Sequence, residues 1–165
     1  MVTTQPAEQL PHDSPEVVKP IVIRAIEPDD RAVWEPLWNG YLDFYGKHIS
    51  QETTDSTWQR LTRSDDIHGL IAVNRDLEGI GIVHFFYHPS TSTIGGNCYI
   101  QDLFVSVSAR RCGVGRKLVL GAVEAARKRG AAVVYWQTEE FNASARRLYE
   151  RIAKRSPFIR YNIEL

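Results

Sequence analysis

A glycine-containing segment in the second half of the chain has the residue types that bind an anion. Arg110–Lys117 reads RRCGVGRK and stands between an apolar run, Tyr99–Val105, and a stretch with helical spacing. Gly113 and Gly115 leave the main chain without side chains where it turns, so amide N–H groups are exposed at the start of a helix. Four of these eight residues are Arg or Lys. We therefore expect a phosphate or pyrophosphate group to bind at this turn.

Two common phosphate-binding patterns do not fit this segment. The chain contains no G-x-x-x-x-G-K-[ST] string, which a P-loop requires. A dinucleotide-binding fold places G-x-G-x-x-G after its first strand, whereas GVGRKL lacks the third glycine and comes late in the chain. Two glycines alone would also fit an ordinary strand–turn–helix connection. A second motif is needed to decide between a ligand site and a simple turn.

The elements that must position this turn alternate between strands and helices, which indicates an α/β sheet covered on both faces. β-branched and apolar runs predict strands at Ile21–Ile26, Ile67–Val73, Gly79–Tyr87, Cys98–Val107, Ala132–Thr138 and Pro157–Leu165. Helical spacing predicts helices from Pro28 to Gly46, around Trp58 and Leu61, and over Gly113–Arg129 and Asn142–Ala153. The continuous apolar run at Ala132–Thr138 is typical of a strand buried on both sides.

The second motif is Asn142–Tyr149, which reads NASARRLY. Together, R-x-x-G-x-G at Arg110–Gly115 and N-x-x-A-x-x-L-Y here resemble the acetyl-CoA loop and the following helix of the GCN5-related N-acetyltransferase (GNAT) superfamily. The resemblance runs from about Ile21 to the C-terminus. More narrowly, YWQT at 135–138 and FIRY at 158–161 are similar to the histone/polyamine acetyltransferase branch.

The resemblance implies a mixed, mostly antiparallel central sheet of six to seven strands, splayed between the fourth and fifth strands, with helices on both faces. Residues 21–165 would form a single N-acetyltransferase domain. Residues 1–20 contain four prolines and few large apolar groups, so we expect a flexible N-terminal tail.

The implied activity is transfer of an acetyl group from acetyl-CoA to a primary amine: a small amine, a polyamine, an amino acid or a lysine side chain. Neither Cys98 nor Cys112 has a recognisable nucleophile setting, which favours direct attack by the amine. The alternative is a non-catalytic acyl-CoA-binding regulatory module. Gln101 favours this alternative, because some polyamine-acetylating members have a Glu base at that position.

The resemblance also assigns cofactor-binding positions. The main chain of Leu103–Val105 would bond the pantetheine arm, and the amides from Arg111 to Lys117 would surround the pyrophosphate. Asn142 would touch the cofactor, although it is also a good helix N-cap. The implied set is Leu103, Phe104, Val105, Arg110, Arg111, Cys112, Gly113, Val114, Gly115, Arg116, Lys117 and Asn142.

Tyr149 matches the family's proton donor to the leaving thiolate, and a phenol is a competent acid for that step. Its other interpretation is a half-buried helix aromatic. Asp102 is the candidate proton acceptor, directly or through water, or a partner for a cationic substrate. Because neighbours on a strand point to opposite faces, Asp102 does not simply replace Gln101. Tyr99, on the same face as Gln101, is a second candidate for lining the acceptor site.

Aromatic residues of the first helical stretch, Trp38 and Tyr41 among them, could line a pocket for an amine with an apolar body, although helical spacing alone also predicts burial in the core. His84 and His88 fit structural roles better than metal ligation, and we expect no metal.

The 165 residues carry 20 Lys+Arg against 20 Asp+Glu, which argues against binding nucleic acid through bulk charge. No apolar run approaches a membrane span, and the N-terminus has no secretory signal, so we expect a cytoplasmic protein without a membrane partner. Residues 101–165 hold 13 Lys+Arg against 6 Asp+Glu, as suits a phosphate-bearing ligand. Since dimers are common in similar proteins, we expect a homodimer, with the terminal strand as a place for pairing.

Overall fold

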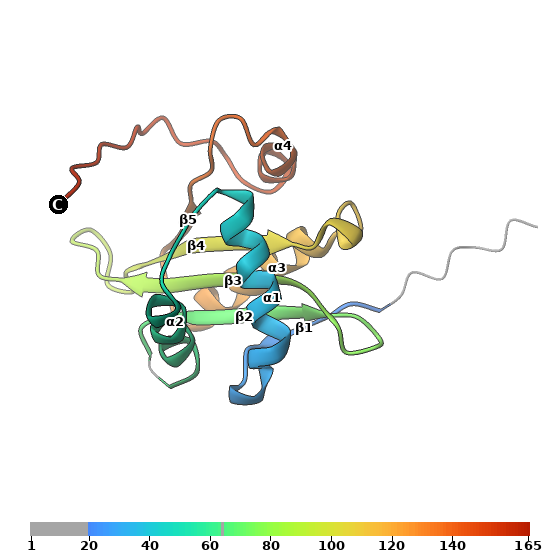
Figure 1. The fold of residues 1–165 in the computed structure, drawn as a ribbon. Helices are drawn as coiled ribbons and strands as arrows, with labels where there is room; N and C mark the ends of the chain where they lie inside the picture. The colour runs from blue at the N-terminus through green and yellow to red at the C-terminus, as the bar shows by residue number, and fades with distance from the viewer. Residues whose placement is uncertain (1–19, 64) are drawn as a thin grey trace, which may run out of the picture.

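A computed structural model describes residues 20–63 and 65–165; the tail predicted over residues 1–20 lies outside this range apart from Pro20. The protein is built on a five-stranded sheet with strand order β1-β2-β3-β4-β5 (Figure 1). Strands β1 to β4 are antiparallel neighbours, and β5 runs parallel to β4. The strands are β1 Val22–Ala25, β2 His68–Val73, β3 Gly79–His88, β4 Asn97–Val105 and β5 Val133–Trp136.

Helices cover both faces of this mixed α/β sheet, as the sequence predicted. α1 and α2 lie on one face and α3 lies on the other, while α4 lies beyond β5 (Figure 1). The helices are η1 Pro28–Asp30, α1 Arg31–Phe44, α2 Gln51–Arg63, η2 Val107–Ala109, α3 Val114–Lys128 and α4 Ala143–Ile152. Within the described residues, every helix is too short or too polar to span a bilayer.

Each face of the sheet has its own apolar cluster. On the α1 side, Trp34 and Ile82 are fully buried, and Leu37 and Leu42 are nearly so. On the α3 side, the predicted inner face of α3 is confirmed: Leu118, Ala122 and Ala126 are fully buried against β3 and β4. Burying these side chains fixes both helices against the central strands, which carry the site.

β4 continues beyond the end of its pairing with β5, at the place where the sequence predicted a splay, which stays a prediction. β4 pairs with β3 from Asn97 to Val105, but its parallel pairing with β5 ends at Ile100 opposite Trp136. Within the described residues, no strand therefore pairs with the β5-facing edge of Leu103–Val105. The predicted wedge for the cofactor would lie along this edge, and the edge is called the wedge below.

The prediction of six to seven strands is wrong, because the sheet has five. Pro157–Leu165 forms no strand: it leaves α4 and passes beyond the short β5 without forming a ladder. Its apolar side chains stay exposed, Phe158 at 90% and Ile163 at 90%. The alternating pattern that predicted a strand shows only that the segment could pair, since a strand needs a partner edge.

The prediction that Ala132–Thr138 is buried on both sides is also wrong. β5 covers only Val133–Trp136, and Val133 is 50% exposed while Tyr135 is 39% exposed. The exposure alternates: Val134 and Trp136 pack against the cluster on the α3 side, while Val133 and Tyr135 on the opposite face are the exposed residues. β5 is also the last strand of the sheet.

Candidate active site

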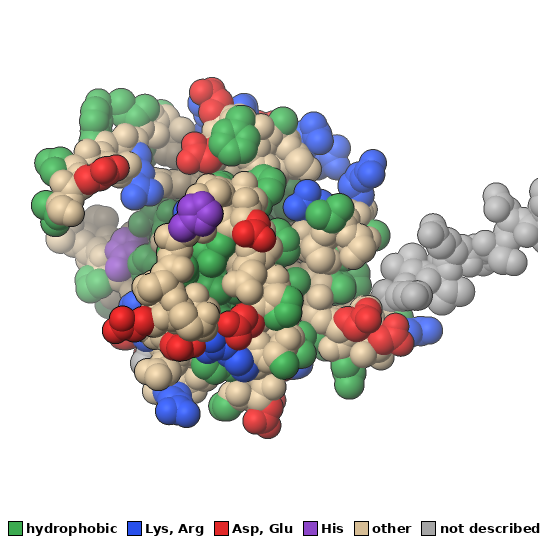
Figure 2. All heavy atoms as spheres, viewed as in Figure 1, with side chains coloured by type: hydrophobic (Ala, Val, Ile, Leu, Met, Phe, Trp, Pro, Cys, Tyr) green, Lys and Arg blue, Asp and Glu red, His purple; other side chains and the backbone are tan. Residues whose placement is uncertain are grey.

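The turn between β4 and α3 adopts a conformation that aims main-chain amides outward. Gly113 has φ +79° and Arg111 has φ +65°, both in the left-handed region that a side chain makes costly. Val114 follows directly and is 1% exposed, so its side chain fixes the end of the turn in the core. A space-filling view shows Lys and Arg side chains gathered near the end of β4 and η2 (Figure 2).

The first amides of α3 have no partner within the helix. The first helical bond runs from Lys117 N to Gly113 O at 3.1 Å, and no side chain caps Gly113. The N–H groups of Val114, Gly115 and Arg116 are therefore free to bind an anion at the positive end of the helix dipole. The open space at Gly113, where an added Cβ would meet nothing within 4 Å, leaves room for it.

The wedge beside β4 has further groups that suit coenzyme A. The Arg110 side chain donates a hydrogen bond from Nε to Val105 O at 3.2 Å, which holds its charge at the mouth of the wedge. Thr138, just after β5, has a buried hydroxyl without a hydrogen-bond partner among the described residues. Such a group calls for a ligand or water partner. The residues present thus fit a phosphopantetheine arm and its pyrophosphate.

Helix α4 brings Tyr149 to the same region. Asn142 caps the helix, its Oδ1 accepting a hydrogen bond from Ala145 N at 3.2 Å, and its Nδ2 lies 3.5 Å from the Tyr45 hydroxyl. The Tyr149 ring packs edge-on against Trp136, with centroids 5.2 Å apart. Burial, with a smaller effect from Tyr45, raises the pKa of Tyr149 to about 12. The phenol therefore carries its proton at neutral pH, as an acid must.

Asp102 lies behind this region on a β-bulge. His84 on β3 pairs with Asp102, while the next residue, Phe85, pairs with Ile100, so Gln101 is the extra residue. Alternation along β4 is broken there, and the Asp102 side chain turns toward α1, where it lies 3.0 Å from His84 Nδ1. The expectation that strict alternation governs positions 101 and 102 is therefore wrong.

Tyr41 connects the acidic and phenolic groups. Burial, together with the charge of Asp102 and a hydrogen bond to it, raises the pKa of Tyr41 far above its ordinary value. The Tyr41 ring lies 5.1 Å from that of Tyr45, which reaches Asn142 at the start of α4. The two predicted catalytic side chains, Asp102 and Tyr149, thus lie at opposite ends of one chain of contacts through α1.

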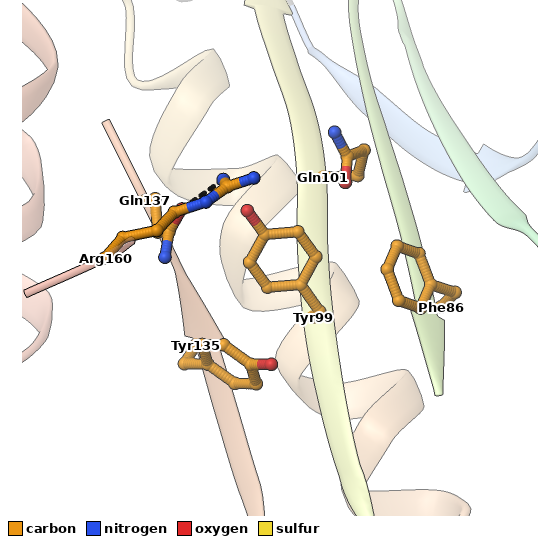
Figure 3. A pocket seen from close by; sticks show the side chains of 6 residues that line it. All are labelled: Phe86, Tyr99, Gln101, Tyr135, Gln137 and Arg160. Carbon is orange, nitrogen blue, oxygen red and sulfur yellow. Dashed lines mark hydrogen bonds between the residues drawn. The ribbon is translucent and has the colours of Figure 1, made fainter. Parts of the chain in front are cut away.

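A cavity of about 340 Å³ opens next to the bulge. Figure 3 shows the Tyr99 hydroxyl directed toward Arg160 and Gln137, with Tyr135 beside it. Arg160 donates a hydrogen bond to Gln137 Oε1 at 2.6 Å. The lining residues are Phe86, Tyr99, Gln101, Tyr135, Gln137 and Arg160. The structure thus brings the predicted Tyr99 and Gln101 together in one cavity.

Trp38 and Tyr41, predicted to line the acceptor site, are 7% and 5% exposed and lie behind the cavity rather than in its wall. Sequence reasoning missed Gln137 and Arg160. Both fall in the strings YWQT and FIRY, which were quoted for the family branch, so the signal was present.

The two cysteines differ in their surroundings. Burial raises the pKa of the Cys98 thiol to about 11, so it stays protonated and unreactive. Cys112 is exposed on the anion-binding turn. In residues 20–63 and 65–165, no three His, Cys, Asp or Glu side chains cluster as a metal site would need.

Residues 34–153 match the model of the Acetyltransferase (GNAT) family, and the chain belongs to that family. It is 32% identical over 143 residues to a D-amino-acid N-acetyltransferase, HPA3, of Saccharomyces cerevisiae, a match that covers 86% of this chain and 89% of the yeast protein. These findings make the chain an N-acetyltransferase, and they give no support to the non-catalytic alternative.

Solved structures share the fold. A ribosomal-protein-alanine N-acetyltransferase from Brucella melitensis biovar Abortus 2308 has a TM-score of 0.76 at 20% identity, over 88% of this chain and all of that one. The aminoglycoside acetyltransferase AAC(6')-Iy, solved with a bisubstrate analogue containing CoA, has a TM-score of 0.71 at 16% identity, over 87% of this chain and 99% of that one. Acetyltransferases of this family use acetyl-CoA.

The turn makes a direct prediction for Gly115→Leu. An added Cβ would lie 3.3 Å from Leu148 and 3.7 Å from Val105, so a larger side chain fills the space between the turn and α4. We expect coenzyme A to bind at least about tenfold more weakly, a loss of about 1.4 kcal/mol. Isothermal titration calorimetry measures this, with Lys128→Leu at the exposed end of α3 as the control. Unchanged affinity in Gly115→Leu would contradict the assignment of the turn.

Proposed function

We propose that this N-acetyltransferase acetylates the amine of a small acceptor that also carries a carboxylate, such as a free amino acid. The observation that carries the proposal is the charge of the cavity beside the bulge: Arg160 is the one charged side chain among its six lining residues. A guanidinium matches a carboxylate with two parallel hydrogen bonds. A polyamine, with several positive charges, would meet this cation with no lining carboxylate to offset it.

The surroundings of Arg160 suit it to hold an anion. Gln137 accepts one of its hydrogen bonds, which fixes the guanidinium beside Tyr99. Burial raises the pKa of Tyr99, and the positive charge of Arg160 opposes that rise. The guanidinium and the phenol therefore interact electrostatically. Aromatic rings form much of the rest of the wall. The ring centroids of Phe86 and Tyr135 lie 5.4 Å and 5.0 Å from that of Tyr99. Ring faces attract an ammonium group or cover an apolar side chain.

The similarity to a yeast D-amino-acid N-acetyltransferase supports this class of acceptor. Membership in the histone/polyamine branch stays a prediction, and a polyamine belongs in any acceptor panel for that reason. The cytoplasmic location and the absence of nucleic-acid and membrane partners also stay predictions.

The chemistry divides between two side chains. Bound acetyl-CoA supplies the acetyl thioester and, after transfer, a thiolate leaving group. The acceptor amine must lose a proton to attack, and we assign Asp102, acting directly or through a water, as the group that receives it. Tyr149, which carries its proton at neutral pH as any tyrosine does, donates the proton that the thiolate takes up. The turn amides and the wedge edge of Leu103–Val105 orient the cofactor.

We further propose that the enzyme is a homodimer, with the segment after α4 in the interface. Five large apolar side chains of this segment are between 73% and 120% exposed, which is unusual for a face that stays in water. Figure 2 shows hydrophobic side chains along the C-terminal segment, at the upper left of the view. The five exposed side chains are Phe158, Ile159, Tyr161, Ile163 and Leu165.

Substitution of Arg160 tests the acceptor class. In Arg160→Gln we expect the KM for an amino acid to rise at least about tenfold, because one charged hydrogen-bond pair is lost. The KM for the amine lacking the carboxylate should change little. A thiol-release assay over both enantiomers of an amino acid, its amide, its decarboxylated amine and spermidine measures this. Arg155→Gln, exposed in the same segment, is the control.

Two results of that panel would contradict the proposed acceptor. One is equal use of the amino acid and its decarboxylated amine by the unmodified enzyme, and the other is a preference for spermidine. Neither result would affect the assignment of the chain as an N-acetyltransferase.

Removing the Tyr149 hydroxyl tests the proton donor. In Tyr149→Phe we expect kcat to fall about 100-fold, since general acid catalysis contributes roughly that much or more. Coenzyme A affinity should stay within a factor of about two, because the ring packing on Trp136 is kept. Steady-state kinetics and calorimetry measure the two quantities, with the exposed Tyr161→Phe as the control. An unchanged kcat removes Tyr149 from the mechanism.

The dimer is tested by light scattering after size-exclusion chromatography. We expect twice the 18.8 kDa chain mass for the unmodified protein. The double variant Phe158→Asp, Ile163→Asp should elute at the single-chain mass, since two charges would be buried at the interface. A monomeric unmodified protein at micromolar concentration would refute this arrangement.

A further inference from the structure

Three buried side chains from three different elements form a line of hydrogen bonds that ends at Asp102. Trp34 on α1 donates from Nε1 to His84 Nε2 at 2.9 Å. His84 on β3 in turn lies with Nδ1 3.0 Å from Asp102 Oδ2 on β4. Trp34 is fully buried, His84 is 1% exposed and Asp102 is 7% exposed. Polar groups so deeply buried are costly unless each is paired, so this arrangement is specific rather than incidental.

The indole fixes the protonation of the imidazole. A tryptophan N–H can only donate, so His84 Nε2 must accept and carries no hydrogen. The hydrogen of the neutral ring is therefore on Nδ1, where it is donated to the Asp102 carboxylate. The imidazole cannot become doubly protonated without giving up the bond to Trp34.

The groups around His84 agree with this arrangement. From β4 it faces Asp102, and from α1 the rings of Trp34 and Trp38 pack against it with centroids 6.0 Å and 5.4 Å away. Arg31 lies on the outer side, its guanidinium 5.5 Å from the centroid of the Trp34 ring. On the partner strand β2, His84 is paired with Gly69, which adds no charge.

Two further groups act on Asp102 itself. Tyr41 on α1 lies close enough to Asp102 that the carboxylate raises the pKa of the phenol, and Lys47 donates a hydrogen bond to the Tyr41 hydroxyl at 3.3 Å. Asp102 thus has a hydrogen-bond partner from β3 and a phenol from α1 beside it, and the bond to His84 fixes the orientation of the carboxylate.

We propose that His84 is a positioning residue that holds the Asp102 carboxylate toward the acceptor amine, and that Trp34 locks His84 in the tautomer this task requires. The inference rests on the proposed role of Asp102 as proton acceptor. Because the line ends at an indole, which cannot take up a proton, a proton received by Asp102 cannot move inward. It must leave by a route other than the His84–Trp34 line.

Paired substitutions at His84 separate positioning from packing. His84→Asn keeps an N–H near the place of Nδ1, whereas His84→Leu removes it; both leave the Trp34 N–H without its partner. We expect both variants to lose stability, but only His84→Leu to lose kcat by about tenfold or more. The KM for acetyl-CoA should be unchanged in both. If both variants lose kcat equally, or neither does, the positioning role is wrong.

The tautomer is measured by two-bond ¹H–¹⁵N correlation spectra of the histidine rings. We expect His84 to be neutral with its hydrogen on Nδ1 in the unmodified protein. In Trp34→Phe the Nε2 atom loses its donor, so the pattern should change. Trp58→Phe, which removes a ring 5.0 Å from Trp34 but no bond to His84, should preserve it. A hydrogen on Nε2 in the unmodified protein would overturn the proposal.

Asp102→Asn distinguishes failure of this inference from failure of the proposed mechanism. If Asp102→Asn keeps full kcat, Asp102 is not the proton acceptor, and the positioning role proposed for His84 is then wrong as well. If Asp102→Asn is slow while His84→Leu is normal, the mechanism stands and only the inference about His84 fails.

Discussion

Strand β4 carries one more residue than β3 can pair with, and the extra residue is Gln101. This bulge changes which face each following side chain takes, so Asp102 turns toward α1 and meets His84. The pairing between β4 and β5 ends at the preceding residue, Ile100. The bulge thus orients a buried carboxylate and lies where the edge of β4 that β5 leaves unpaired begins. The candidate catalytic and binding groups are arranged around it.

The site keeps charges of opposite sign apart. Helix amides and basic side chains of the turn lie at the far end of β4, where a pyrophosphate needs them. Asp102 stays inside, held by His84 and Tyr41, while Arg160 stands at the acceptor cavity. The proposed acceptor, carrying both an ammonium and a carboxylate, would complement the last two. Tyr149, with its pKa raised by burial, keeps its proton at the other end of the Tyr41–Tyr45 contact.

Features encoded in short segments could be predicted from the sequence. The glycines and Val114 define the turn, and Asn142 caps α4 where the motif expects it. The bulge could not be predicted, because it depends on the register between two strands that a loop separates. The hydrogen bonds that lead to Asp102 were missed for the same reason: His84 is 18 residues from Asp102 in sequence and Trp34 is 50 residues from His84. The alternating pattern of Pro157–Leu165 showed that this segment could form a strand. It could not show whether a neighbouring strand would be available to pair with it.

The central claim, that coenzyme A lies between β4 and β5 with its pyrophosphate on the turn, is tested most directly by titrating it into ¹⁵N-labelled protein. We expect the largest amide shifts at Leu103–Val105 and at Val114, Gly115 and Arg116. A second cavity lies between α3, β5 and α4, lined in part by Val123, Arg127 and Val134. Shifts confined to that cavity, with the turn amides unmoved, would contradict the claim.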